Sequence, residues 1–388
     1  MKEAAGVRGA PGRVLVEGTG LIGTSIALAL RERGTEVWLS DADAAAAKLA
    51  ADLGAGTVVP DLRDAKGIAD VAVIAVPPAD IAATLALAQD QGVADCYTDV
   101  ASVKQLPVAQ ARKLGCDLAS YVPGHPLAGR ERHGPAAARA DLFLGRTWAL
   151  CPLPETAPAA VGVVTALVRA CGADPVHADP RTHDHWVALV SHAPHLVAAA
   201  MAARLAPSSV SPDALRLAGQ GLRDVTRVAA GDTALWTQIL RANAAPVAEV
   251  IAAVAADLAE AARTLAADAA PEAGGFSSPD EVSAGLGLLD RGRAGSARIP
   301  GKHGGKPHAF SVVQVVIADQ PGELARLFNA VGLAGVNIED VRIEHSPGLP
   351  SGVAELFVRP GQVPALLDAM EAGGWPAGSV AGMPGLTR

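Results

Sequence analysis

A glycine-rich segment near the start of the chain, GTGLIG from Gly18 to Gly23, restricts the possible folds more than any other feature. It follows a short apolar segment, Arg13–Gly18, that predicts a β-strand. It precedes a stretch from Leu21 to Arg33 with helical periodicity. A glycine turn between a strand and a helix is typical of the first β-α-β unit of a doubly wound α/β domain. We therefore predict a Rossmann-type fold for the N-terminal part of the chain.

The alternation of strands and helices continues through the first half of the sequence. Apolar segments predict further strands at Glu36–Asp41 and Val71–Pro78, and in the later segments CYTDVA and RTWALCP. An alanine-rich helix separates the first two. This order predicts a parallel sheet with helices on both faces. We place this domain at residues 12–178.

The residue composition and spacing of the sequence change after residue 178. Alanine and leucine recur at helical spacing over residues 179–273, which predicts an all-helical domain. Its small-residue faces suit close packing between subunits, so we expect a homodimer. Residues 274–307 are rich in Gly, Pro and Ser and form the predicted linker. Residues 308–388 carry a β-α-β-β-α pattern, which predicts a small ferredoxin-like α+β domain.

The composition excludes several classes of protein. The 388 residues exceed what one core holds, and a net charge of −8 argues against binding to nucleic acid or to anionic membranes. We see no apolar N-terminal segment typical of a signal peptide and no apolar run of transmembrane length, so we expect a cytoplasmic protein. The four cysteines lie far apart without CxxC spacing, which predicts buried free thiols.

The glycine segment itself indicates dinucleotide binding. Gly18 permits the tight turn, Gly20 lets a pyrophosphate approach the backbone, and Gly23 lets helix and strand touch. Asp41 ends the second predicted strand, eighteen residues after Gly23. A carboxylate there accepts hydrogen bonds from a ribose diol and repels a 2′-phosphate, so we expect NAD rather than NADP.

Further residues complete the predicted cofactor site. They flank the glycine turn or end the third strand: Leu21, Ile22, Val76 and Pro77. Glu17 stands directly before the turn, where an apolar residue is usual. Its carboxylate would weaken the binding of a pyrophosphate, so we expect it to point away from that group.

Four polar segments accompany this loop. They are TDVASVK (Thr98–Lys104), GHPLAGRE (Gly124–Glu131), SHAPH (Ser191–His195) and GLRDVTRVAAGDTALW (Gly221–Trp236). Each has an ordinary explanation by itself, since a lone histidine on an apolar helix is usually a core residue and an arginine is often a surface charge.

Together with GTGLIG and the later NIEDVRIEH, these segments resemble the prephenate/arogenate dehydrogenases of tyrosine biosynthesis, in the form that carries a C-terminal ACT domain. The resemblance spans nearly the whole chain. It implies that His125 is the catalytic histidine, with Ser102 beside it. It also implies that His195 and Arg227 bind substrate, and that Glu131 lies at the entrance of the site.

The chemistry of this family explains the residue types. Prephenate is a cyclohexadiene with a hydroxyl at C4 and, across the ring, a quaternary carbon that bears a carboxylate. Hydride leaves C4 for NAD while the ring loses CO2, so a general base must take the hydroxyl proton, and a histidine such as His125 has a suitable pKa. Ser102 can orient the hydroxyl, and Arg227 suits the ring carboxylate. We expect no metal site, because His192 and His195 lack a third ligand.

Several alternatives stay open at this point. Arogenate is the close rival substrate, since Arg130 or His195 could meet either its amino acid or the keto acid of prephenate. A β-hydroxyacid or 6-phosphogluconate-type dehydrogenase would want a catalytic lysine in the helical domain, and residues 180–268 contain none. A sensing module that only binds NAD and an amino acid has no need of Ser102, His125 and Arg227.

For the last domain, the resemblance to ACT domains implies amino-acid binding, with the end product tyrosine as the natural effector. Pro321 and Gly322 predict a turn whose following helix offers N–H groups to a carboxylate. Asn337, at the start of the next predicted strand, could hold the ligand's amino or carboxylate group. The alternative is a small domain that only aids dimerisation.

Overall fold

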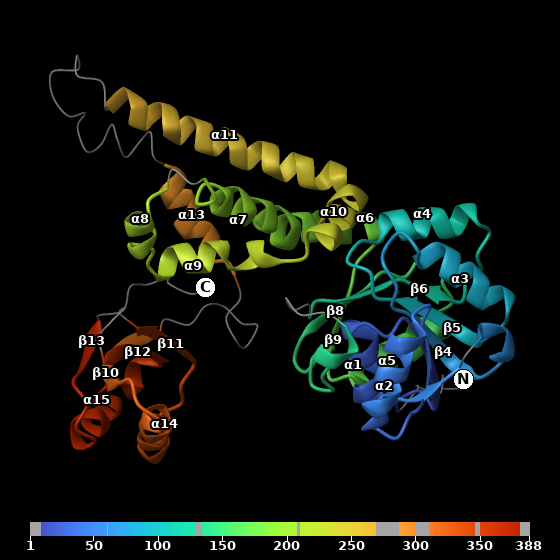
Figure 1. Cartoon of the computed structure of the whole chain (residues 1–388), viewed down its shortest axis with the longest axis horizontal. Helices are drawn as coiled ribbons and strands as arrows, with labels where there is room; N and C mark the ends of the chain where they lie inside the picture. Colours follow the sequence, from blue (N-terminus) through green and yellow to red (C-terminus); the bar gives the residue numbers. More distant parts are fainter. Residues whose placement is uncertain are drawn as a thin grey trace, which may run out of the picture. The chain divides into compact units, whose positions relative to one another are not determined.

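The computed structural model describes residues 9–59, 61–128, 134–207, 210–268, 287–299, 310–345 and 350–380 (Figure 1). The chain divides into two compact units, Met1–Ala253 and Val254–Arg388. The first unit holds the predicted nucleotide-binding fold and most of the helical region, and the second holds a small α+β fold.

A six-stranded sheet forms the centre of the first unit. Its strands are β1 (Arg13–Glu17), β2 (Glu36–Ser40), β3 (Thr57–Val58), β4 (Ala69–Ile74), β5 (Ala94–Asp99) and β6 (Tyr121–Val122). They are ordered β3-β2-β1-β4-β5-β6, and every neighbouring pair is parallel. The strand order reverses direction at β1, which confirms the predicted doubly wound sheet and puts the glycine turn at the switch point.

Helices cover both faces of this sheet because alternate side chains of each buried strand point to opposite sides. Val14 and Val16 pack in the core that includes residues of α1 (Leu21–Arg31), α2 (Ala44–Asp52) and α5 (Pro158–Ala170). Leu15 packs in the opposite core, with α3 (Ile81–Asp90) and α4 (Gln105–Lys113) (Figure 1). All four cysteines are free, as predicted, and three of them are buried, but Cys116 is only half-buried, so the prediction of a buried thiol is wrong there.

The segment RTWALCP forms a strand as predicted, but this strand does not join the parallel sheet. It is β8 (Thr147–Leu150), in a separate sheet of order β7-β8-β9 with β7 (Gly124–Pro126) and β9 (Asp174–His177). Pro123 stands between β6 and β7 and has no N–H for the ladder, so the chain leaves the large sheet there. As a result, β7 runs antiparallel to β8 and sets His125 opposite Ala149.

Helices make up the described part of residues 180–268. They are α6 (Pro180–Val187), a π-helical turn (Ala188–His192), α7 (Ala193–Ala203), α8 (Pro212–Arg216), α9 (Gln220–Thr226), a 3-10 turn (Arg227–Ala230), α10 (Thr233–Ala242) and α11 (Ala244–Asp268). The π turn coincides with the segment SHAPH. Pro194 lacks the N–H that an α-helical bond to Val190 needs, which explains the wide turn before α7. The predicted all-helical region is confirmed.

The expectation that the chain has no apolar run of transmembrane length is wrong for this region. The continuous stretch Pro180–Ala203 is long and apolar enough, by length and composition alone, to cross a membrane. Its first half, however, buries His183 and Asp184 against the nucleotide-binding domain, where Asp184 accepts backbone hydrogen bonds from α4. These polar contacts hold the first half of the stretch in the folded first unit, while apolar side chains such as Leu189 and Val190 stay exposed.

The second unit contains α13 (Leu288–Ser296) and a four-stranded antiparallel sheet of order β11-β12-β10-β13. The strands and helices follow in the order β10 (Ser311–Ala318), α14 (Glu323–Leu333), β11 (Asp340–His345), β12 (Ser351–Val358), α15 (Val363–Ala372) and β13 (Ala377–Val380). This is the ferredoxin-like arrangement, and the core of the sheet packs against α14 and α15.

Two details of this unit differ from the sequence-based expectation. The last strand, β13, was not predicted, because its residues AGSV have little strand propensity and pair only through β10. The middle strand begins at Asp340, so Asn337 lies before β11 and not within it.

Candidate active site

The glycine turn is packed as a dinucleotide loop requires. Gly18 has a φ of +97°, and a Cβ there would lie 2.4 Å from the carbonyl oxygen of Ala75. A Cβ on Gly23 would lie 1.9 Å from the carbonyl oxygen of Gly18. In contrast, no described atom lies within 4 Å of the position that a Cβ of Gly20 would occupy. The turn is therefore closed towards the sheet and open at Gly20, where a phosphate group would approach.

The N-terminus of α1 is also suited to an anion. Within the described residues, no side chain caps this helix and its first turn contains no acidic residue. The backbone N–H groups of this first turn, including those of Leu21 and Ile22, thus present their partial positive charge to a bound pyrophosphate. Val76 and Pro77 follow β4, and the backbone nitrogen of Val76 lies beside Gly18.

Asp41 lies where the ribose of a dinucleotide is expected. One of its carboxylate oxygens accepts hydrogen bonds from the backbone N–H of Thr19 at 2.6 Å and from the Thr19 hydroxyl at 2.8 Å. The other accepts the N–H of Asp43 at 2.8 Å. These bonds fix the carboxylate beside the glycine turn, with lone pairs left for hydroxyl donors. The residues present therefore fit a dinucleotide with an unmodified ribose.

Glu17, directly before the turn, lies next to Ser40 and Asp41 at the end of β2. Burial raises the pKa of its carboxyl and the charge of Asp41 adds to the rise, although a hydrogen bond with Ser40 opposes both. One carboxyl oxygen is buried without a partner among the described residues. A raised pKa favours the neutral acid, which reduces the repulsion that this residue would exert on a pyrophosphate.

His125 lies at the centre of a buried polar chain. Its Nδ1 is 2.9 Å from Nε2 of His183, and Nδ1 of His183 is 2.8 Å from Oδ1 of Asp184. All three side chains are buried. His125 comes from β7, whereas His183 and Asp184 come from α6. This row of hydrogen-bonded side chains therefore joins the nucleotide-binding domain to the helical region.

The surroundings of His125 keep it neutral. Burial lowers its pKa well below the usual value, and the rings of His183 and His192 and the charge of Lys104 lower it further. A neutral imidazole can accept a proton, which is the state that a general base requires.

A second buried network fixes the backbone on which His125 stands. The ammonium group of Lys104 bonds to Oδ1 of Asp99 and to the carbonyl oxygen of Gly124, and Lys104 and Asp99 are both fully buried. The hydroxyl of Tyr121 donates to the other Asp99 oxygen at 2.6 Å. Gly124, the residue before His125, is therefore connected to the end of β5 through Lys104, which pairs with Asp99.

His195 and Trp236 form the third group. Their rings are stacked, with centroids 3.6 Å apart and planes at 14°. A Cβ on Gly231 would lie 2.6 Å from Nε1 of Trp236, so only glycine leaves room for this ring. Nδ1 of His195 is buried without a partner among the described residues, and burial lowers the pKa of the imidazole. A flat neutral pair of this kind suits contact with a ring-shaped substrate.

His192 connects these groups. Its ring makes an edge contact with Trp236, with centroids 6.1 Å apart, and its Nδ1 lies 3.1 Å from Nδ2 of Asn243. Asn243 Nδ2 also donates to the backbone oxygen of Asp184 at 2.8 Å. Burial lowers the pKa of His192 to about 4. The lowered pKa thus favours the neutral form of His192, as it does for His125 and His195.

The other sequence-predicted residues are placed less completely. Ser102 is half-buried in the segment between β5 and α4, at the same sheet edge as the glycine turn. Arg227 is exposed and lies in the turn after α9, which packs against α7, the helix of His195. Arg130 and Glu131 lie outside the described residues.

The sequence-based prediction missed three residues of the site. His183 and Asp184 were not singled out, and Lys104 was quoted within TDVASVK but given no role. The available signal was the segment RTHDHW, which is unusually polar for the start of an apolar helical domain. It could mark His183 and Asp184 as candidates, but not identify their partners.

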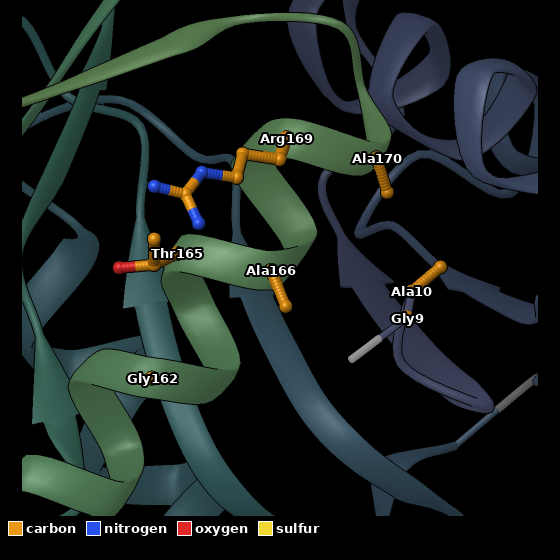
Figure 2. Close-up of a pocket in the computed structure, with 7 residues that line it drawn as sticks. All are labelled: Gly9, Ala10, Gly162, Thr165, Ala166, Arg169 and Ala170. Carbon is orange, nitrogen blue, oxygen red and sulfur yellow. The ribbon is translucent and has the colours of Figure 1, made fainter. Parts of the chain in front are cut away.

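A pocket of about 560 Å³ lies elsewhere, along α5 (Figure 2). Figure 2 shows the Thr165 and Arg169 side chains on the helix, with Gly9 and Ala10 across from it. Its lining contains none of the predicted site residues. In the part of the chain that the structure describes, no group of three or more His, Cys, Asp or Glu side chains could hold a metal ion.

In the second unit, Gly322 has a φ of +86° and precedes α14, whose N-terminus has no side-chain cap among the described residues. The buried Glu323 accepts a hydrogen bond from Nε1 of Trp375 at 2.6 Å and pairs with Arg326. Asn337 donates to Glu339 at 2.9 Å. The predicted regulatory residues Pro321, Gly322 and Asn337 are thus all described, and the Asn337 amide already has one partner.

Comparison with known proteins agrees with this geometry. Residues 26–177 match the family model for the nucleotide-binding domain of prephenate dehydrogenase, and residues 179–273 match the model for its dimerization domain. The protein of Streptomyces niveus named probable prephenate dehydrogenase NovF is 40% identical over 367 residues, which cover 94% of this chain and 99% of NovF. The prephenate dehydrogenase of Bacillus subtilis is 33% identical over 237 residues, 59% of this chain and 64% of that protein.

Solved structures show the same fold. Synechocystis arogenate dehydrogenase has 25% identity and a TM-score of 0.59, covering 73% of this chain and 99% of that chain. Prephenate dehydrogenase from Aquifex aeolicus, in complex with hydroxyphenyl propionate and NAD+, has 24% identity and a TM-score of 0.63, covering 73% and 97%. With both domain models matched in order and one relative similar over almost its whole length, this chain belongs to the prephenate dehydrogenase family.

Proposed function

We propose that the chain is an NAD-dependent prephenate dehydrogenase, which converts prephenate to 4-hydroxyphenylpyruvate by oxidative decarboxylation. The observation that carries the proposal is the buried His125, whose pKa is held low and which follows the carboxyl end of β6, while the dinucleotide turn follows the carboxyl end of β1 in the same parallel sheet. The 40% identity to NovF over 94% of the chain supports the choice of substrate.

His125 acts as the general base in this proposal. It takes the proton of the C4 hydroxyl at Nε2, the ring nitrogen that does not face His183. Bound NAD supplies the acceptor for the hydride that leaves C4. Ser102 orients the hydroxyl from the segment that follows β5. The ring becomes aromatic as CO2 leaves, which favours the reaction. The imidazole of His125 is therefore a strong enough base for the hydroxyl proton.

The helical region holds the other end of the substrate. Arg227 binds the ring carboxylate, since a guanidinium matches a carboxylate with two parallel hydrogen bonds. The stacked His195–Trp236 pair supports the ring, with Nδ1 of His195, which has no partner among the described residues, as a polar contact. Arg130 and Glu131, which lie outside the described residues, are further proposed substrate contacts on the resemblance alone. Fixing both ends of one small ring places C4 for reaction, which is an orientation effect.

Arogenate is the second candidate substrate, because Synechocystis arogenate dehydrogenase has the same fold. Steady-state assays of the purified protein with NAD and either substrate decide between the two. We expect the higher kcat/KM with prephenate. A higher value with arogenate would reassign the substrate, and no turnover of either would remove the proposed activity.

Cofactor preference should depend on Asp41. We expect the unmodified protein to prefer NAD over NADP by about 10- to 100-fold in kcat/KM, because a 2′-phosphate would meet a carboxylate that Thr19 holds in place. The double variant Asp41→Ser, Ala42→Arg should shift the preference towards NADP. Equal use of both cofactors by the unmodified protein would contradict the assignment.

The helical region should form a homodimer. Large apolar side chains are exposed on the stretch that carries the site, including Trp186 at 49%, Leu189 at 61% and Val190 at 67% exposure. Such a surface is typical of a protein contact, and the region matches the dimerization domain model. Light scattering at micromolar concentration should give twice the mass of 39.0 kDa. An active monomer would refute this prediction.

Tyrosine should inhibit the full chain through the ferredoxin-like unit, which acts as an ACT regulatory domain. The N-terminus of α14 after Gly322 has no side-chain cap among the described residues, and the acidic Glu323 in its first turn is paired with Arg326, so this end can accept a carboxylate; Asn337 lies before β11. A protein cut near Gly301 should stay active and lose part of the inhibition. If truncation leaves inhibition unchanged, and calorimetry gives the same tyrosine affinity for the full chain and for the cut protein, the unit has another role.

A further inference from the structure

The side chain of Asp184 bonds to two different parts of the first unit. It is fully buried. Oδ1 accepts the backbone N–H of Lys104 at 2.8 Å and contacts Nδ1 of His183 at 2.8 Å. Oδ2 accepts the backbone N–H of Gln105 at 2.9 Å. A single carboxylate on α6 therefore binds both the N-cap and the first residue of α4, and the histidine that contacts His125.

These contacts determine where the protons lie. An ionised carboxylate only accepts hydrogen bonds, so the proton between His183 and Asp184 belongs to Nδ1 of His183. Burial alone would raise the pKa of Asp184, but the bonds from His183, Gln105 and Lys104 outweigh it and hold the pKa low. With its one proton on Nδ1, His183 presents a lone pair at Nε2. His125 must donate its own Nδ1 proton to that lone pair across 2.9 Å.

The consequence concerns the other nitrogen of His125. With the proton held on Nδ1, Nε2 carries the lone pair. The opposite tautomer of His183 would donate to His125, and a neutral His125 would then hold its proton on Nε2 and could not act as a base there.

We propose that Asp184 is a positioning residue that sets the tautomer of His125 through His183. His183 transmits the effect and does not touch substrate. The role of Asp184 in catalysis rests on the proposed function, but the tautomer itself does not. Because the same carboxylate binds the N-terminus of α4, the base takes its working tautomer only when α6 is seated against α4.

The first test reads the tautomer without substrate. In protein labelled with ¹⁵N-histidine, NMR should show His183 and His125 both protonated on Nδ1. The variant His183→Phe keeps a ring of similar size and leaves the two α4 amides bound to Asp184. We expect His125 to lose its single Nδ1–H form in this variant. A His125 protonated on Nε2 in the unmodified protein, or unchanged in His183→Phe, would overturn the proposal.

The second test separates positioning from simple structural support. Asp184→Ala should lower kcat with NAD and prephenate by about 10² or more, the scale expected when the carboxylate that orients a histidine base is removed. In the His183→Phe background, the same change should alter kcat by no more than about twofold, the scatter of additive effects. An equal loss in both backgrounds would mean that Asp184 only holds α4 in place.

Two controls complete the design. Asp179 caps the same helix with bonds to the N–H groups of Arg181 and Thr182, and Asp179→Ala should lower the melting temperature without lowering kcat. NAD affinity, measured by calorimetric titration, should stay within about twofold in every variant. If the unmodified protein turned over no prephenate, the proposed function would fail, and the NMR result would still decide the tautomer.

Discussion

Replacing His125 with asparagine should lower kcat by roughly 10² to 10⁴, the contribution of a general base. Asparagine cannot offer a lone pair at the position of Nε2. Its amide can still donate towards Nε2 of His183, as Nδ1 of His125 does in the proposed tautomer, so the fold should persist. The glycine turn and Asp41 belong to other elements, and NAD affinity measured by titration should be unchanged. Steady-state kinetics with prephenate measure the loss.

The pH profile of the unmodified protein provides a second measurement of the same group. Burial, with the neighbouring histidines and Lys104, lowers the pKa of His125 below its usual 6.5. The base is therefore already deprotonated at neutral pH. We expect kcat/KM to stay level from mildly alkaline to mildly acidic pH and to fall only as pH drops below the usual range of histidine.

Arg227→Ala is the matched contrast, since this change should act mainly on KM by removing a contact made both before and during the reaction. If His125→Asn kept a near-normal kcat, His125 would be a structural residue and the base would lie elsewhere.

Replacing Lys104 with methionine should have the largest effect on stability. The change leaves the carboxylate of Asp99 fully buried without its cation. Breaking a buried ion pair by removing one partner costs about 3–5 kcal/mol of unfolding free energy. The carbonyl group of Gly124 also loses a donor, so the segment that carries His125 should loosen. Chemical denaturation followed by circular dichroism measures the loss.

Arg13→Met is the control for this prediction. It removes the same charge from a pair with Asp70 whose side chains are 45% and 38% exposed. Exposed pairs contribute about 0–1 kcal/mol, so this variant should be nearly as stable as the unmodified protein. The double variant Lys104→Met, Asp99→Asn should recover part of the loss because no net charge stays buried. Equal stability of the Lys104 and Arg13 variants would contradict the buried pair.

The sequence by itself determined the features that depend on local spacing. The turn from Gly18 to Gly23 and Asp41 were recognisable because they follow the spacing of one β-α-β unit, in which Gly18 and Gly23 avoid steric clashes and Gly20 leaves the turn open. The helical region was also predicted from local spacing, because strand patterns end after residue 178 and apolar residues then recur at helical intervals. His125 was found through the residues around it, since GHPLAGRE resembles a family motif.

Only the tertiary structure decided which buried polar groups meet. His125 and His183 are 58 residues apart, and Lys104 and Asp184 are 80 apart, so no local pattern relates them. The strand RTWALCP was predicted, but its neighbours depend on Pro123 turning the chain out of the large sheet. A buried donor or acceptor must find a partner wherever packing brings one. Sequence spacing therefore indicated which residues carry the chemistry, and long-range packing decided which of them can hold the base in its working form.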